Sequence, residues 1–386
     1  MKRLLCSLCA IALIATLCFG CARSEEPAPT SPAPTGPSLD IDLDVYPTYE
    51  NLNDDEKVIW DNICNAIKSH STDRILIGVY NSEYAHGNAV RRFEQMYREL
   101  VYSCPDYFWV NLYDYELHTT EEGSTRRLEL QLRYTLTNSK TKEYQAKYNQ
   151  RVEEIVSAAK EIPDLFQRVL FVYDTIIDGA EYDYALAESA DFEDIGLTAY
   201  GCLVEGKTIC SGYALAFRAI MEELGIECGV EFNSYQSLSI FQGHVWNYCK
   251  LEDEYYYFDL TWDDAGDDNL LSYHLFFGLN REDMTKASYL LTGSAPVPQC
   301  TGTKYNYYRY LGLSFATYDF DTVKTVIREH KDDGTIVLRF DNSEEVEKAV
   351  TDLFDNDRIV DIFPSLTEVY YAMPETDIHL VIELVE

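Results

Sequence analysis

Hydrophobic side chains follow two different spacings in the first part of the folded chain. Those that recur every three or four residues, as on one face of a helix, are Val90, Phe93, Tyr97 and Leu100. Those that alternate with polar residues, as on a strand with one wet face, are Leu128, Leu130, Leu132, Tyr134 and Leu136. Two further helices are expected, over 144–162 and 163–177. The pattern predicts an N-terminal α/β region over 45–160, which we interpret as a scaffold or substrate platform.

The end of the chain shows similar patterns on a smaller scale. Strands are expected over 311–317, 335–340 and 378–384. One helix face is marked by Phe320, Val323 and Ile327. Asn342 followed by Glu345 resembles a capping box that opens another helix. We therefore expect a small separate α/β module over 303–386, with a role in packing or recognition.

A helix in the middle of the chain begins at a cysteine. Ala214, Phe217, Met221 and Leu224 recur at helical spacing, between turn signals at Gly206 and Gly225. Cys210 therefore falls in the first turn, where the positive end of the helix dipole favours a thiolate. Cysteines in such positions titrate at about 3.5–7.5 rather than about 8.5. A thiolate is the nucleophile that acyl transfer needs. The alternative is an inert buried cysteine.

Three strands are predicted after this helix. They cover 227–233, 243–248 and 255–262, and the polar pair Glu252-Asp253 between the last two predicts a hairpin turn. With the turn centred there, Trp246 faces Asp259, and His244 lies two residues along on the same face. His244 and Asp259 are then diagonal neighbours, about 7–8 Å apart at the backbone. A register slip of one residue would place them on opposite faces.

This register predicts a different role for each of the side chains of Cys210, His244 and Asp259. Asp259 accepts a hydrogen bond from one imidazole nitrogen of His244 and fixes its tautomer, which leaves the other nitrogen for Cys210. Each residue also has a structural interpretation, because a histidine in a strand is commonly just a packed side chain. A carboxylate among Tyr and Phe residues, however, needs a partner.

The order of these residues resembles that of the transglutaminase-like superfamily. His244 follows Cys210 by 34 residues, and Asp259 follows His244 by 15. The resemblance, which covers Pro163 to Thr285, is carried by Leu203-Val204-Glu205-Gly206-Lys207, Gly212-Tyr213-Ala214, His244-Val245-Trp246-Asn247 and Tyr257-Phe258-Asp259-Leu260-Thr261-Trp262. It implies an α+β, papain-like fold, with a Cys-bearing helix on an antiparallel sheet, over a catalytic domain at 161–300. It also implies Cys210 as nucleophile, His244 as general base and acid, and Asp259 as the residue that orients His244.

The superfamily contains protein cross-linkers, peptidases, peptide N-glycanases and inactive relatives. The resemblance therefore implies a cysteine enzyme that forms a thioester with a peptide or protein amide, and we expect hydrolysis rather than amine transfer. The alternative is a binding or scaffold protein with a retired site. A third interpretation is a cell-wall cysteine endopeptidase, whose Cys-Ser-Gly motif resembles Cys210-Ser211-Gly212. In that motif an Asp usually stands where this chain has Ile209.

Several residues beside these three are secondary candidates. Tyr200, Trp246 and Trp262 could line the cleft or assist an oxyanion hole, although each suits core packing as well. An acidic loop follows the third strand and contains Asp263, Asp264, Asp267 and Asp268. It lacks the spacing of an EF-hand, so we interpret it as a solvated loop at the cleft rim. No metal site and no cofactor are expected.

The N-terminus is typical of an export signal. Lys2 and Arg3 precede an apolar run from Leu4 to Phe19, which is shorter than the roughly 20 residues of a membrane span. Gly20-Cys21 then resembles the lipobox of bacterial lipoproteins, with Cys18 where Leu is preferred. We predict a signal peptide at 1–21, lipidation of Cys21 and a Pro-rich linker at 22–44. The protein would be lipid-anchored to the outer face of the cytoplasmic membrane or an equivalent envelope membrane. The alternative is cleavage without lipidation.

Charge and cysteine content limit the partners. The formal net charge of −35 disfavours nucleic acid as a partner. The resemblance implies a peptide or protein substrate, with cell-wall peptide as one candidate. Beyond the leader the chain has seven cysteines, Cys64, Cys104, Cys202, Cys210, Cys228, Cys249 and Cys300. Seven is odd, so at least one thiol is left over if the others pair, and spacing alone indicates no disulfide framework. The sequence does not specify an oligomeric state.

Overall fold

The computed structural model describes residues 36, 37, 39, 46–80, 83–123, 125–189, 193–233, 243–264, 274–286, 297–364, 368–374 and 378–385. The predicted signal peptide, Cys21 and most of the Pro-rich linker lie outside these residues, as do Asp267 and Asp268 of the acidic loop. In the described part of the chain, no helix is long and apolar enough to cross a membrane.

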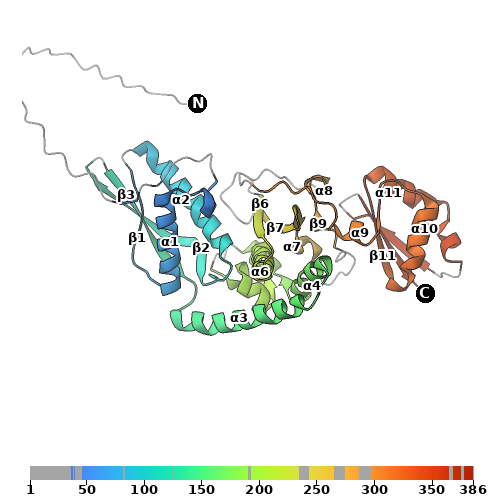
Figure 1. The fold of residues 1–386 in the computed structure, drawn as a ribbon, viewed down its shortest axis with the longest axis horizontal. Coiled ribbons are helices and arrows are strands. Elements are labelled where there is room, and N and C mark those ends of the chain that lie inside the picture. The colour runs from blue at the N-terminus through green and yellow to red at the C-terminus, as the bar shows by residue number, and fades with distance from the viewer. Residues whose placement is uncertain are drawn as a thin grey trace, which may run out of the picture. The chain divides into compact units, whose positions relative to one another are not determined.

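The N-terminal region is a three-stranded antiparallel sheet with two helices (Figure 1). Its strands, in the order β1-β3-β2, are β1 (Ile75–Tyr80), β3 (Thr125–Tyr134) and β2 (Val110–Glu122). A 3-10 turn at Tyr49–Asn51 precedes helix α1 (Asp54–Ser69), and α2 is Glu83–Ser103. The predicted helix face lies in α2, and the predicted alternation lies in β3, where Leu128, Leu130 and Leu132 are buried. The helix face is confirmed, and the strand is confirmed as far as Tyr134, where β3 ends before the predicted Leu136.

A second group of elements packs a helix onto an antiparallel sheet. The helices are α3 (Asn138–Lys160), α4 (Leu165–Ile177), α5 (Tyr184–Glu188), α6 (Cys210–Glu223), α7 (Leu260–Asp263) and α8 (Arg281–Lys286). The sheet, in strand order, is β6 (Cys228–Asn233), β7 (His244–Leu251), β8 (Glu254–Phe258) and β9 (Phe277–Leu279). Two short strands, β4 (Glu181–Tyr182) and β5 (Lys207–Thr208), pair in parallel, and short helical turns cover 195–197 and 201–205. Helix α6 packs on β6 and β7 and contacts α3 and α4, which confirms the α+β prediction.

One hydrophobic cluster joins the N-terminal region to this second group. The Tyr102 ring at the end of α2 stacks on Phe232 of β6, with centroids 5.9 Å apart. The Phe108 ring lies 4.9 Å from that of Tyr200. The same cluster extends to α6 through Phe217 and Ile220. The predicted boundary near residue 160 therefore falls within a continuous core, and the domain limits stay a prediction.

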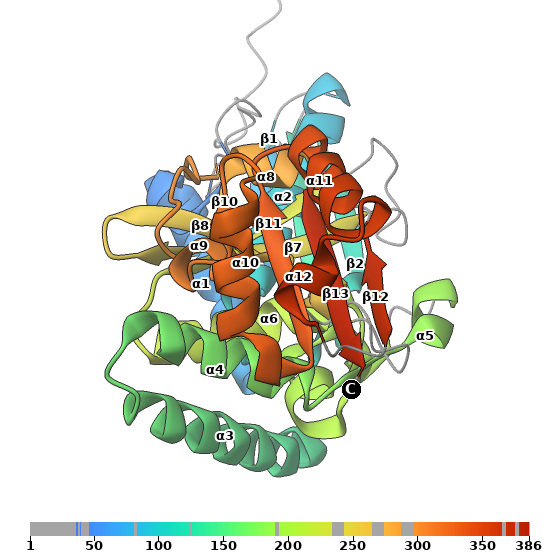
Figure 2. The ribbon, with the colours of Figure 1, turned by 90° about the vertical axis from the view of Figure 1, so that its right-hand side faces the viewer.

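The C-terminal module has a sheet of its own, ordered β10-β11-β13-β12. Its strands are β10 (Ser314–Phe315), β11 (Thr335–Phe340), β12 (Glu368–Ala372) and β13 (His379–Val385), and its helices are α9 (Tyr307–Tyr310), α10 (Phe320–Glu329), α11 (Ser343–Val350) and α12 (Ile359–Ile362). Helical turns at 331–333 and 351–355 complete it. Figure 2 shows α10 and α11 beside this sheet, and Val323 and Ile327 of α10 are buried in the module's core.

Two details of this module differ from the prediction. The strand expected over 311–317 is only two residues long, because Leu313 follows a helical turn and the chain bends after Phe315. The Asn342 side chain caps α11 by accepting from the Glu345 N–H at 3.1 Å, as expected. The Glu345 carboxylate, however, accepts from the N–H of Tyr318 at 2.6 Å and pairs with Lys348, so its partners differ from those of a capping box.

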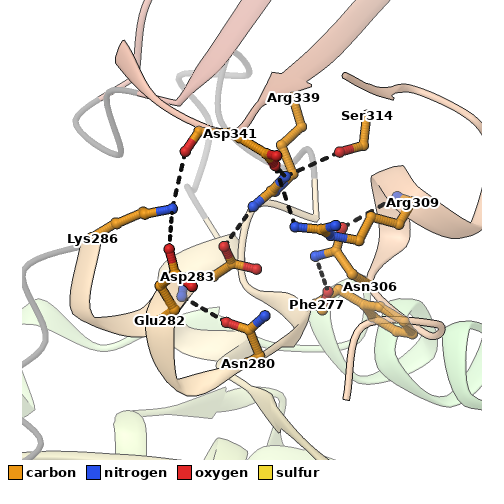
Figure 3. Close-up of polar contacts among 10 residues, drawn as sticks. All are labelled: Phe277, Asn280, Glu282, Asp283, Lys286, Asn306, Arg309, Ser314, Arg339 and Asp341. Atoms are coloured by element: carbon orange, nitrogen blue, oxygen red, sulfur yellow. Dashed lines mark hydrogen bonds and ion pairs between the residues drawn. The ribbon is translucent and has the colours of Figure 1, made fainter. Parts of the chain in front are cut away.

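A buried ion pair fastens the module to the segment that follows β9 (Figure 3). The Arg339 guanidinium of β11 is fully buried and contacts the Asp283 carboxylate of α8 at 2.5 Å. The same guanidinium contacts Asp341 at 3.0 Å and donates to Ser314 Oγ at 3.0 Å. Apolar packing continues across this junction, because Trp246 of β7 belongs to the module's hydrophobic cluster.

Removing the charge of Arg339 should destabilise the protein strongly. Arg339→Met keeps most of the side-chain volume but leaves the buried Asp283 carboxylate without its cation. We expect a loss of about 3–5 kcal/mol in the free energy of unfolding, measured by urea denaturation. The matched control is Arg309→Met, because Arg309 pairs with Asp341 at 3.4 Å near the surface and should contribute at most about 1 kcal/mol. Equal losses in the two variants would contradict this assignment.

Candidate active site

Cys210 is held at the start of α6 by close packing of the turns behind it. It is the first residue of the helix, and the preceding Ile209 is extended. A Cβ on Gly212 would lie 1.8 Å from Thr208 Oγ1 and 2.8 Å from the Thr198 carbonyl oxygen, so only glycine fits there. The Ser211 hydroxyl donates to the Leu197 carbonyl at 2.9 Å. These contacts fix the backbone of the first helical turn, while the Cys210 side chain keeps about 9% of its surface exposed.

His244 and Asp259 meet at one end of the β7–β8 hairpin. The ladder pairs Asn247 with Phe258 and Leu251 with Glu254, which is the predicted register. His244 Nε2 lies 2.5 Å from Asp259 Oδ2, so the predicted contact is present. The sheet itself is tied to α6 by the buried Asn247 side chain, which donates to the Ala214 carbonyl at 2.9 Å.

The third predicted strand is wrong at its end. We expected it to run through Trp262, but β8 stops at Phe258 and Leu260–Asp263 form the helical turn α7. The cause is Asp259, whose Oδ1 accepts from the backbone N–H groups of Thr261 at 3.1 Å and Trp262 at 3.3 Å. Asp259 thus has one oxygen on the helical turn and the other on His244, and it is about 1% exposed. This bidentate role fixes the direction in which the carboxylate points.

The charges around His244 favour the imidazolium. Burial lowers its pKa, but the Asp259 carboxylate, its hydrogen bond, and a hydrogen bond and charge interaction with Cys210 outweigh burial and raise the pKa to about 10. The contact with Cys210 brings all three predicted residues together. Since Nε2 faces Asp259, Nδ1 is the ring nitrogen left for the Cys210 sulfur.

The predicted cleft-lining rings occupy different environments. Trp246 is buried and stacks on the His244 ring, with centroids 5.8 Å apart. Trp262 meets the same ring edge-on at 5.9 Å and is 54% exposed, so it stands at the rim. Tyr200 is fully buried, and its ring stacks on that of Tyr144 at 4.7 Å. The contacts of Tyr200 and Trp246 are those of core side chains, whereas Trp262 can reach a substrate.

One neighbour of the site was not predicted. Tyr182 of β4 pairs with Thr208 of β5, two residues before Cys210. Burial, together with charge interactions that include Cys210 and Asp259, raises the pKa of Tyr182 to about 12. The ring of the exposed Tyr184 lies 5.0 Å from that of Tyr182. Strands of two residues leave no periodic signal, so the sequence pattern could not place Tyr182 beside a cysteine 28 positions later.

The interpretation of Asp263 as part of a solvated loop is wrong. Its side chain is about 1% exposed and accepts from the Tyr173 hydroxyl at 2.6 Å and from the Phe276 N–H at 3.1 Å. Burial raises the pKa of this carboxyl to about 7. The Tyr173 hydroxyl oxygen also lies 2.9 Å from the Asp259 carbonyl oxygen, so its single proton is shared between Asp263 and the backbone at the start of α7. Asp264 accepts from the Tyr213 hydroxyl of α6. Within the described residues, no cluster of three or more His, Cys, Asp or Glu side chains could hold a metal.

Comparison with known proteins identifies the class of this domain. Residues 149–260 match the model of the Transglutaminase-like superfamily, so the chain contains a transglutaminase-like domain. The match includes Cys210, His244 and Asp259, and it begins earlier than the resemblance from Pro163 that we read in the sequence. No curated protein matches the chain.

Two solved structures are similar to part of the chain. A crystal structure of a TGase shows 13% identity and a TM-score of 0.27, over 38% of this chain and 44% of that one. A protein from Cytophaga hutchinsonii, described as a proposed cysteine protease, shows 14% identity and a TM-score of 0.24, over 38% of this chain and 62% of that one. The aligned segments thus span less than two thirds of either neighbour.

Proposed function

We propose that this protein is a cysteine enzyme that cleaves peptide or protein amides through a thioester on Cys210. The proposal rests on one observation, which is the contact of His244 with both Asp259 and Cys210. Cys210 is the first residue of α6. The Cys210 sulfur attacks the amide carbonyl carbon, the carbon–nitrogen bond breaks, and His244 gives its proton to the leaving amine. Water then attacks the thioester, His244 takes its proton, and Cys210 leaves as thiolate.

The surroundings of Cys210, His244 and Asp259 support a catalytically active site rather than an inactive one. Asp259 is held by two backbone N–H groups in the direction of His244, an arrangement that a merely structural histidine does not need. Trp246 packs against the His244 ring and limits its rotation. The positive end of α6 and the Cys210 N–H would face the oxyanion that forms during attack.

We propose hydrolysis rather than amine transfer, and the exposure of the described rings beside the site supports this preference. Trp262, which meets the His244 ring edge-on, is 54% exposed, and Tyr184, whose ring contacts Tyr182, is 68% exposed. Cross-linking needs a path that admits an amine and excludes water. We therefore expect a peptide amide incubated with a primary amine at modest concentration to yield mainly the free acid. Mass spectrometry of the acyl product checks this, and predominant amine incorporation would overturn the preference for hydrolysis.

We also propose that the enzyme works at the cell surface, on peptide or protein substrates that include cell-wall peptide. The basis is the apolar run that ends at Gly20-Cys21, followed by the Pro-rich linker. The mature chain would begin at Cys21 and carry lipid, and the linker would give the catalytic domain reach. Mass spectrometry of the mature N-terminus tests this. An unmodified N-terminus at another residue would refute the anchor without affecting the chemistry proposed for Cys210.

A further inference from the structure

A closed ring of hydrogen bonds holds the backbone of Asp259. The Asp259 N–H donates to the Phe276 carbonyl at 3.2 Å. The Asp259 carbonyl oxygen lies 2.9 Å from the Tyr173 hydroxyl oxygen. The Asp263 carboxyl joins these two partners, because it lies 2.6 Å from the same hydroxyl and accepts from the Phe276 N–H at 3.1 Å. The backbone of Asp259 is therefore held at its donor by the segment before β9 and at its acceptor by α4.

The members of this ring are buried. Tyr173 is fully buried, Asp263 is 1% exposed and Phe276 is 8% exposed. The Tyr173 ring packs edge-on against Phe217 of α6 and Phe277 of β9, with centroids 5.9 Å and 5.0 Å away. Burial raises the pKa of Asp263 to about 7, so near neutral pH a second proton is available to the two contacts of the Tyr173 hydroxyl. Breaking such a ring leaves buried polar groups unsatisfied.

The ring fixes a position that the capping bonds do not fix. The N–H groups of Thr261 and Trp262 set the direction of the Asp259 carboxylate relative to α7. The β7–β8 ladder ends at Phe258, one residue before Asp259. The ring ties Asp259 to α4 and to the segment before β9. A shift of about 1 Å here would lengthen the 2.5 Å contact between Asp259 Oδ2 and His244 Nε2, and misplacements of this size are costly in catalysis.

We propose that Tyr173 and Asp263 are positioning residues of the active site, which hold Asp259 where its carboxylate meets His244. This inference rests on the function proposed above, because it assigns two further residues to the same site. Both side chains are buried, so they act through Asp259 rather than on the substrate. A purely structural role would lower stability without changing the protonation of His244, and this difference makes the proposal testable.

The first test follows the protonation of His244 in the full chain and needs no turnover. Histidine labelled with ¹³C at Cε1 gives one NMR signal for each of the seven histidines, and His244→Gln identifies the signal of His244. Burial lowers the pKa of His244, but the Asp259 carboxylate and its hydrogen bond outweigh burial and raise it to about 10. Tyr173→Phe should displace the carboxylate and lower the titration midpoint by at least about one pH unit. An unchanged midpoint in the folded variant would overturn the proposal.

Substitutions of Asp263 separate hydrogen bonding from charge. In Asp263→Asn the amide oxygen can accept from the Phe276 N–H, and the amide N–H can donate to the Tyr173 oxygen. The Tyr173 proton is then left for the Asp259 carbonyl, so the His244 midpoint should stay within about half a pH unit of the wild type. Asp263→Leu has no polar atoms and should lower the midpoint as Tyr173→Phe does. Equal falls in the two Asp263 variants would overturn the ring as the cause.

The matched control is Tyr134→Phe in the N-terminal region. The Tyr134 hydroxyl also lies within hydrogen-bonding distance of two backbone carbonyls, those of Ala66 and Ser71. Its loss should lower the melting temperature without moving the His244 midpoint. An equal fall of the midpoint in this control would mean that general loosening, rather than the ring, affects His244, and it would overturn the proposal.

Kinetics give a second readout, at a temperature at which circular dichroism shows every variant to be folded. Tyr173→Phe should lower kcat for a peptide amide by about 10–100-fold and leave KM within about twofold, because only the placement of Asp259 changes. Wild-type kcat in this variant would overturn the proposal. If the wild type itself turns over no amide, the proposed function fails, while the titration of His244 still decides whether Tyr173 and Asp263 position Asp259.

Discussion

Replacing Cys210 by serine is expected to reduce kcat for amide hydrolysis to near background, a loss of about 10⁶-fold if the enzyme behaves like other triad hydrolases. The reason is chemical, because a serine hydroxyl is a much weaker nucleophile than a cysteine sulfur in acyl transfer. The side chain is almost the same size and lies at the start of α6, so the fold should persist. Steady-state kinetics on a peptide amide, with circular dichroism for folding, measure the effect.

The matched control for this substitution is Cys64→Ser. Cys64 lies on α1 with a partly exposed thiol and takes no part in the proposed reaction. Its variant should keep wild-type kcat under reducing conditions. If Cys210→Ser retains substantial kcat, then Cys210 is not the nucleophile, whatever the geometry around it. If neither the wild type nor the variant turns over any amide, a binding protein with an inactive catalytic site becomes the better interpretation.

Asp259→Asn should lower kcat by about 10³–10⁴-fold while leaving the fold intact. The amide oxygen can keep the two hydrogen bonds from Thr261 and Trp262 that start α7. The amide NH₂ then faces His244 Nε2, which must become an acceptor, so the ring proton moves to Nδ1. The nitrogen meant to accept the proton of Cys210 is then already protonated. The carboxylate that stabilises the imidazolium is also lost.

The control for Asp259→Asn is Asp253→Asn in the turn of the same hairpin. Asp253 is exposed, so removing its charge should change kcat by less than about twofold. Asp259→Ala separates the two roles of the residue, because it also removes the cap of α7 and should lower the melting temperature. An Asp259→Asn variant with wild-type kcat would contradict the orienting role. A variant that fails to fold would show that capping, rather than tautomer control, dominates.

The hairpin at the site could be predicted from sequence because its information is local. Alternation and a polar turn fix the register, and the register alone places His244 and Asp259 on one face. The end of the third strand could not be predicted from alternation, because Tyr257 to Trp262 is apolar enough to suit a strand. The competing signal was the capping preference of Asp259, which stops β8 and starts α7.

Non-local contacts account for what the sequence did not predict. Asp263 follows the hairpin in a run of acidic residues, and its buried carboxylate is satisfied by the hydroxyl of Tyr173 on α4 and by the Phe276 N–H. Tyr182 joins the site through a two-residue pairing with β5. In each case the contact is made with a residue that is distant in sequence, so the hydrophobic periodicity of the chain does not reveal it.

The claim that His244 activates Cys210 as a nucleophile is tested most directly by iodoacetamide labelling at neutral pH. Mass spectrometry of the peptides gives a separate rate for each cysteine. We predict that Cys210 is alkylated at least about tenfold faster than Cys300, and that His244→Gln removes this advantage. Labelling of Cys210 no faster than Cys300, or at the same rate with and without His244, would contradict the proposed mechanism.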